Sequence, residues 1–177
     1  MEDRDRIIIT GSGNVAFYVY QFASFLDYEI VIFDNQEERL TPDRFPLASE
    51  RIGGDIVENI SSYEIRSTDS IVIVTHRHHF DEAVLKTVIA SPARYIGVLS
   101  NRKQVVAYFG KLTALGIQDE RLERIHAPIG LDLGGQKAVE IALSVVAEIQ
   151  AVRYGRAGGF MLLKSRHSSK EKRDNLF

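Results

Sequence analysis

The feature that most constrains this chain is a glycine-rich turn joining a β-branched run to a helical pattern. The run at residues 7–9 leads into Gly11-Ser12-Gly13-Asn14-Val15-Ala16, which fits Gly-x-Gly-x-x-Ala. In this order of strand, turn and helix, the first glycine makes a tight turn and the second lets the backbone approach a pyrophosphate. The positive end of the new helix would bind that anion. The candidate nucleotide ligands are therefore Gly11, Ser12, Gly13, Asn14 and Val15.

A second strand pattern ends in an acidic residue. The apolar run at residues 29–33 stops at Asp34, at the spacing after the first glycine that the dinucleotide fold uses. A carboxylate there accepts two hydrogen bonds from a ribose 2′,3′-diol and repels a 2′-phosphate. Asn35 and Gln36 supply no compensating cation. The sequence therefore favours NAD or a related adenine nucleotide over NADP, with S-adenosylmethionine, which presents the same diol, as an alternative.

Composition narrows the class of protein. A length of 177 residues, with 45% hydrophobic and 26% charged residues, suits one globular domain. The net charge of −2 does not favour nucleic acid, and no apolar run is long enough to span a membrane. The absence of cysteine excludes disulfides, thiolate metal sites and a cysteine nucleophile, and it is compatible with a reducing cytoplasm. We expect a cytoplasmic protein without membrane or nucleic-acid partners.

Charge divides the chain into two parts. Residues 155–177 carry six Lys/Arg against two Asp/Glu, whereas the preceding part is acidic. We predict a Rossmann-like nucleotide-binding domain at residues 1–154 and a basic C-terminal tail at residues 155–177. A solvated tail is favoured over one that docks on an acidic partner.

Strand and helix patterns alternate along the body. Further strands are predicted at residues 53–57, 70–75 and 95–99, and helices after the turns that follow them. The alternation predicts an α/β fold, a doubly wound and mostly parallel sheet with helices on both faces. Residues 35–50 form a long connection containing Arg44-Phe45-Pro46, whose aromatic ring either folds over an adenine or anchors the loop.

Polar residues follow several strands at the point where each strand ends. Because parallel strands end on one edge of a sheet, we expect Gly11, Asp34, Thr75-His76 and Ser100 to share a rim. In this prediction His76 faces a substrate or cofactor, where it could act as a general acid/base, and a structural role is the alternative. His76, His78, His79 and Asp81 supply potential metal ligands, but they straddle a strand-to-helix turn, and we predict no metal site.

A second glycine-rich turn, at residues 130–135, precedes the last helix. Gly130 either helps to bind an anion at the helix N-terminus or belongs to a purely structural turn in which Asp132 bonds its own backbone. The helix at about residues 137–152 is apolar on most of its circumference, which predicts burial and is compatible with a homodimer. Glu140 complements the helix dipole, and Glu148 is expected at an interface or paired with Arg153.

These stretches together resemble the Rossmann domain of the XdhC/CoxI family, the xanthine dehydrogenase accessory proteins. The resemblance extends from about residue 7 to residue 153. The segments that carry it are Gly11-Ser12-Gly13-Asn14-Val15-Ala16, Arg44-Phe45-Pro46, Thr75-His76 with Asp81, Tyr95-Ile96-Gly97 with Arg102-Lys103, Ala127-Pro128-Ile129-Gly130-Leu131-Asp132-Leu133-Gly134, Glu140-Ile141-Ala142 and Ala147-Glu148-Ile149. The Pro-Ile-Gly-Leu-Asp run is the most specific of them.

The resemblance implies an accessory role in the maturation of molybdenum hydroxylases. Family members are thought to bind the molybdenum cofactor, favour its sulfuration and deliver it to the apo-enzyme. In this sequence His76, Arg102 and Lys103 would meet that second ligand or its phosphate. The chain departs from the pattern at Asn14 (usually His), at Ser100-Asn101 (usually Gly-Ser) and at Lys137-Ala138 (usually Thr-Pro).

Many relatives carry a separate N-terminal domain with a cysteine-bearing motif, which this sequence does not include. We therefore expect either that a second polypeptide supplies that domain, beside the molybdenum hydroxylase itself, or that this chain carries only the nucleotide-sensing half of the function. Two other functions remain open from the residues alone. One is an NAD-dependent oxidoreductase in which His76 transfers the proton, and the other is a methyl-transfer enzyme.

Overall fold

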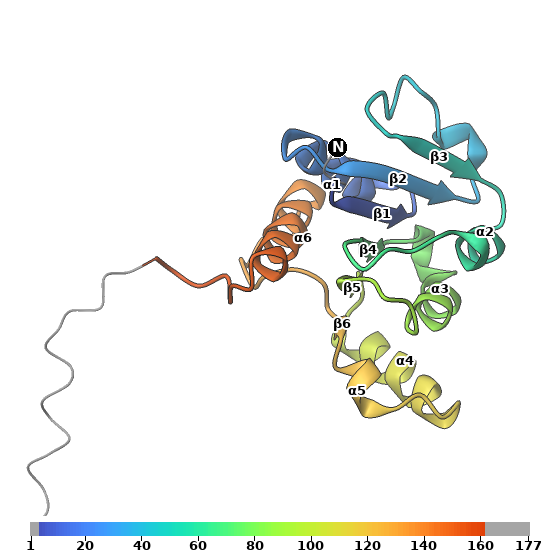
Figure 1. The fold of residues 1–177 in the computed structure, drawn as a ribbon, viewed down its shortest axis with the longest axis vertical. Coiled ribbons are helices and arrows are strands. Elements are labelled where there is room, and N and C mark those ends of the chain that lie inside the picture. Colours follow the sequence, from blue (N-terminus) through green and yellow to red (C-terminus); the bar gives the residue numbers. More distant parts are fainter. Residues whose placement is uncertain (1–3, 162–177) are drawn as a thin grey trace, which may run out of the picture.

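Six parallel strands form a single sheet with helices on both faces (Figure 1). The computed structural model describes residues 4–161. The strand order across the sheet is β3-β2-β1-β4-β5-β6, so the chain runs outward from β1 in both directions, and the predicted doubly wound α/β fold is confirmed. The strands are β1 (Arg6–Thr10), β2 (Glu29–Asp34), β3 (Glu50–Gly53), β4 (Ser70–Ile73), β5 (Tyr95–Val98) and β6 (Ile125–His126).

Every strand pairing is parallel, so all six strands end on the same side, here called the carboxyl edge. The helices that return the chain are α1 (Asn14–Phe25), α2 (Ile56–Ser62), α3 (Asp81–Val88), α4 (Arg102–Ala114), α5 (Asp119–Leu122) and α6 (Ala138–Arg153). Two single turns of 3-10 helix, η1 (Glu37–Arg39) and η2 (His76–His78), lie at the carboxyl edge.

The sheet separates two hydrophobic cores because successive side chains of a strand point to opposite faces. From β1, Ile7 and Ile9 enter the core covered by α1 and α6, whereas Ile8 enters the core covered by α2, α3 and α4. Figure 1 shows α6 beside α1 on one side of the sheet and α2 and α3 on the other. Burial on both faces explains why β1, β2 and β4 are almost continuously apolar.

The structure corrects the predicted position of the third strand and decides between the two roles predicted for Phe45. The third strand lies at residues 50–53, earlier than predicted, because Asp55 caps α2 and accepts the N–H groups of Val57 and Glu58 at 2.8 and 3.0 Å. Phe45 is fully buried and packs edge-on against Phe17 and Tyr20. It therefore anchors the loop and does not cover an adenine.

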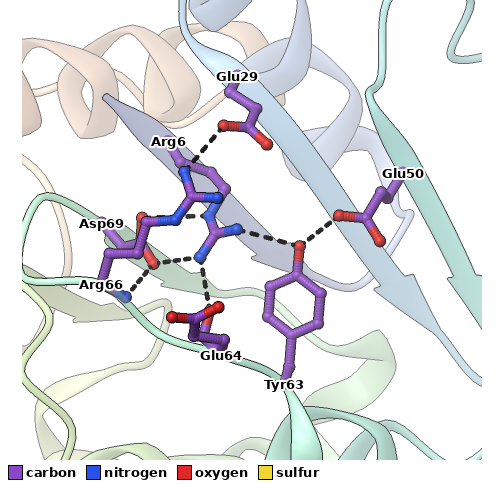
Figure 2. A network of polar contacts seen from close by, with 7 residues as sticks. All are labelled: Arg6, Glu29, Glu50, Tyr63, Glu64, Arg66 and Asp69. Carbon is purple, nitrogen blue, oxygen red and sulfur yellow. Dashed lines mark hydrogen bonds and ion pairs between the residues drawn. The ribbon is translucent and has the colours of Figure 1, made fainter. Parts of the chain in front are cut away.

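A polar network closes the opposite, amino-terminal edge of the sheet (Figure 2). Arg6 at the start of β1 donates to both carboxylate oxygens of Asp69 at 3.1 and 2.7 Å, and neither side chain is more than 3% exposed. The same guanidinium donates to the carbonyl of Glu64 and the hydroxyl of Tyr63, which in turn donates to Glu50 of β3. The network thus ties the beginnings of β1, β3 and β4 together.

The C-terminal end of the described chain has neither helix nor strand after α6, and residues 155–161 are exposed. Most of the predicted basic tail, residues 162–177, lies outside the described residues. The division between a domain at residues 1–154 and a tail stays a prediction. Between residues 4 and 161, each helix is too short or too polar to cross a lipid bilayer.

Candidate functional site

The glycine turn forms as the sequence predicts, at the carboxyl end of β1. Gly11 has a φ of +121°, and a side chain there would overlap the carbonyl oxygen of Val74 at the end of β4. Gly13 has an ordinary φ of −68° and is the N-cap of α1, and no protein atom lies within 4 Å of the position a Cβ would take. Gly11 is therefore required by the fold, whereas Gly13 leaves the approach to α1 open.

The first turn of α1 presents unused hydrogen-bond donors. Among residues 4–161, no acceptor bonds the N–H groups of Asn14, Val15 or Ala16, and the turn contains no acidic side chain. The hydroxyl of Ser12 is also buried, and no group in the described part of the chain bonds it. Free N–H groups at the positive end of a helix form a binding site for an anion, which fits a phosphate group.

Asp34 ends β2 next to this turn and is only 2% exposed. One of its oxygens accepts the N–H of Gln36 at 2.8 Å, and in the described part of the chain no side chain pairs with the other. The turn that follows β1 is bonded to the end of β2, because the N–H of Gly11 donates to the carbonyl of Phe33 at 2.7 Å. The carboxylate is thus fixed beside the glycine turn, and one of its oxygens is available to a further hydrogen-bond donor.

The turn after β4 is organised around Asp81, and His76 is not its anchor. The buried Asp81 accepts the hydroxyl of Thr75 at 2.6 Å and its N–H at 3.2 Å, and its second oxygen lies 2.6 Å from Nδ1 of His78. Arg77 and His78 have φ values of 51° and 61°, a region that side chains other than glycine rarely adopt. His76 remains exposed. Sequence reasoning missed the role of His78, whose spacing of three residues from Asp81 was the available signal.

Two cavities along the carboxyl edge are lined by three of the predicted site residues, His76 in one and Arg102 and Gly130 in the other. Residues 11–15, Asp34 and Thr75 line neither of them. The first, of about 210 Å³, places His76 beside the residues that follow Asp34; its lining is Asn35, Gln36, His76, Arg77, His79 and Phe80. The second, of about 490 Å³, joins Arg102 to the second glycine-rich turn; its lining is Leu99, Arg102, residues 128–136, Ile141 and Ser144. Lys103 is exposed at the start of α4, and Ser100 has a buried hydroxyl without a partner.

Glu148 of α6 holds part of the wall of the larger cavity in place through Gly130. One oxygen of Glu148 accepts the N–H of Gly130 at 2.9 Å and the hydroxyl of Tyr95 at 2.5 Å, and the other lies 3.1 Å from Nδ1 of His126. Burial acts to raise the pKa of Glu148, but the contacts with His126, Tyr95 and Gly130 outweigh it and leave the pKa below its usual value. Burial and the carboxylate hold the pKa of Tyr95 well above its usual range.

Glu148 therefore does not pair with Arg153, contrary to one expectation from the sequence. Arg153 binds Asp5 instead, with Nε 2.6 Å from the carboxylate. The other carboxylate of α6 behaves as expected: Glu140 accepts the N–H groups of Gln136 and Lys137 at 3.0 and 2.9 Å. Because this carboxylate occupies donors at the start of α6, the turn at 130–135 is less suited to a phosphate than the turn at 11–15.

The last helix is less buried than its composition predicts. Leu143 and Val139 are 50% and 37% exposed, and Phe25 of α1 is 84% exposed. A shallow apolar groove of about 270 Å³ runs between α1 and α6. A homodimer stays a prediction. Among residues 4–161, no three His, Asp or Glu side chains are arranged to hold a metal ion.

Comparison with known proteins places these features in context. A family model described as the XdhC Rossmann domain matches residues 7–149. YqeB of Escherichia coli, described as an uncharacterized protein, is 31% identical over 93% of this chain and 30% of its own length. The molybdenum cofactor insertion chaperone PaoD of E. coli is 27% identical over 56% of this chain and 31% of its own length.

A solved structure agrees with the fold. The crystal structure of a xanthine dehydrogenase from Bacillus halodurans superposes with a TM-score of 0.75 and 27% sequence identity. The match covers 86% of this chain and 44% of that one. This chain therefore spans less than half the length of the proteins it matches.

Proposed function

This chain belongs to the XdhC family, and from that premise we propose that it is a nucleotide-binding accessory protein for the maturation of a molybdenum hydroxylase of the xanthine dehydrogenase type. The similarity to PaoD, a molybdenum cofactor insertion chaperone, supports the accessory part of this proposal, and the similarity to the B. halodurans xanthine dehydrogenase supports the type of enzyme. The glycine turn supports the nucleotide part.

The observation that carries the nucleotide site is the open face of Gly13 at the start of α1. Phosphate oxygens would accept the free N–H groups of Asn14, Val15 and Ala16. The buried carboxylate of Asp34 would accept the ribose hydroxyls and disfavour a 2′-phosphate. NAD or a related adenine nucleotide fits this set of groups.

We propose that the cavity between Arg102 and Gly130 receives the second ligand, the molybdenum cofactor as cargo. Its lining is partly apolar, and Arg102 supplies a positive charge for an anionic substituent. Glu148 holds the wall of this cavity through Gly130, and the exposed Lys103 stands at the same helix start. His76 remains the candidate for contact between the two ligands or for proton transfer. The recipient apo-enzyme is the proposed partner.

Thermal melting with nucleotides tests the first step. A ligand that binds only the folded state at 100 times its Kd stabilises it by about 2.7 kcal/mol, so NAD should raise the Tm and NADP should not. Gly13→Ala should keep the Tm of the free protein, because nothing contacts the new methyl group, but should remove the NAD shift. Gly110→Ala in α4, where a methyl group is equally unhindered, is the matched control. An unchanged NAD shift in Gly13→Ala would contradict the site.

Reconstitution tests the accessory step. Purified chain should increase the activity recovered when a xanthine dehydrogenase-type apo-enzyme is mixed with molybdenum cofactor. Arg102→Ala should lower that gain without changing the NAD shift, and His76→Ala should leave the NAD shift intact and impair transfer. Equal recovery with and without the chain would refute the accessory role.

A further inference from the structure

Arg44 lies against the glycine turn and is held there by neutral groups. Its Nη2 donates to the carbonyl oxygen of Ser12 at 2.7 Å. Its guanidinium carbon lies 5.5 Å from the ring centre of Phe17 and 5.4 Å from that of Phe45, within the range of a cation–π contact. The loop is anchored by Phe45, so the position of this positive charge is set by the core.

This guanidinium has no anionic partner in the part of the chain that the structure describes. Among residues 4–161, no carboxylate forms an ion pair with Arg44, and its Nε is buried without a hydrogen bond. Arg6 and Arg94 do have one, since Arg6 binds Asp69 and Arg94 binds Asp5. Arg51 also lacks a carboxylate partner among residues 4–161, but it donates to the carbonyls of Phe45 and Ala48. A buried donor of a cation without an acceptor is costly, and buried charges are normally paired.

A second source of positive potential lies at the same turn. Ser12, which accepts the bond from Arg44, directly precedes the N-cap of α1, whose first N–H groups are free. The hydroxyl of Ser12 is buried without a partner as well. The guanidinium and the helix end therefore meet at the same turn, one through the carbonyl of Ser12 and the other through the first N–H groups of α1. Two sources of positive potential suit two linked phosphate groups better than one.

We propose that Arg44 binds a phosphate group of the ligand at this turn, and that the ligand is consequently a diphosphate, such as a nucleoside diphosphate or a dinucleotide. The inference rests on the proposed nucleotide site. The α1 N-terminus binds one phosphate, and the planar guanidinium donates to the oxygens of the other.

Calorimetric titration with adenosine, AMP, ADP and inorganic pyrophosphate tests the inference. The wild-type protein should bind ADP more tightly than AMP, and AMP more tightly than adenosine. Arg44→Met retains the apolar stem against Phe17 and Phe45 but removes the charge. This variant should bind ADP and pyrophosphate about tenfold to a hundredfold more weakly than the wild type, which is the contribution of a charge-assisted hydrogen bond. Its affinity for adenosine should be unchanged. Arg44→Lys should fall between the two.

The control is Arg121→Met, which removes the same charge from an exposed position on α5 and should leave all four affinities unchanged. Melting of each free variant reports whether it folds. An equal loss of adenosine and ADP in Arg44→Met would mean that Arg44 only supports the turn, and an unchanged ADP affinity would also overturn the proposal. If ADP and pyrophosphate both depend on Arg44 but ADP binds no more tightly than pyrophosphate, the phosphate contact stands and the nucleotide assignment fails. If none of the four probes binds, both fail.

Discussion

Glu148 accepts a hydrogen bond of 2.9 Å from the backbone N–H of Gly130 and so connects the middle of α6 to the second glycine-rich turn. The carboxylate is mostly buried, and Tyr95 and His126 complete its contacts. A charged group in an otherwise apolar helix is thereby satisfied by the wall of the larger cavity.

Glu148→Gln should lower the free energy of unfolding by about 2 kcal/mol at pH 7, because the neutral amide replaces charge-assisted hydrogen bonds. The pKa of Glu148 is depressed in the folded protein, so its stabilisation is fully present above the usual value of 4.5 and is lost as the pH falls through the lower folded value. Urea unfolding between pH 7 and pH 3 should therefore converge for the wild type and the variant at low pH. If the difference in free energy of unfolding between the two proteins stays constant across that range, the stabilisation does not come from the charge of Glu148.

Asp69→Ala should lower the free energy of unfolding by about 3–5 kcal/mol, because it leaves the buried guanidinium of Arg6 without its carboxylate (Figure 2). Urea denaturation measures the difference. Lys111→Ala, which removes the exposed pair with Glu82, should change stability by less than about 0.5 kcal/mol. Similar losses of stability in the two variants would mean that burial does not determine how much these ion pairs contribute.

Gly11→Ala should destabilise the fold by about 3 kcal/mol or more, since the methyl group would meet the backbone at the end of β4 and the φ of Gly11 is positive. Gly13→Ala, two residues away, should cost little. Thermal melting of the two free variants distinguishes them, and comparable Tm values would refute the different roles assigned to these glycines.

Asp34→Asn should keep the fold, because the amide oxygen still accepts the N–H of Gln36. It should reduce the preference for NAD over NADP, because the charge that repels a 2′-phosphate is gone. The comparison of the two Tm shifts at equal nucleotide concentration measures this preference. A preference for NAD that is as strong in the Asp34→Asn variant as in the wild type would rule out the ribose contact.

Much of the fold could be predicted because its signals are local. The buried strands are continuous apolar runs, the turn at Gly11 is dictated by a glycine pattern, and Asn101 caps α4 with the reciprocal bond from Gln104 that its sequence allows. The position of β3 could not be predicted, since its four residues are only partly apolar and an aspartate cap decides where the next helix begins.

The partners of the polar residues were harder to predict than their edge of the sheet. Asp81 reaches back to Thr75 and His78 because two successive residues adopt a left-handed backbone, which a composition of histidines and arginine does not reveal. The contact between Arg44 and Ser12 joins residues 32 positions apart, so only the folded loop brings them together.

The network around Arg6 and Asp69 lies at the edge of the sheet opposite the glycine turns (Figure 2). Its position separates the residues that secure strand alignment from the loops of the proposed nucleotide site. Substitutions in the loops that follow the strands should therefore leave the strand register intact, because the network around Arg6 and Asp69 holds the strands from the opposite edge. This separation makes the fold tolerant of changes that redesign ligand specificity.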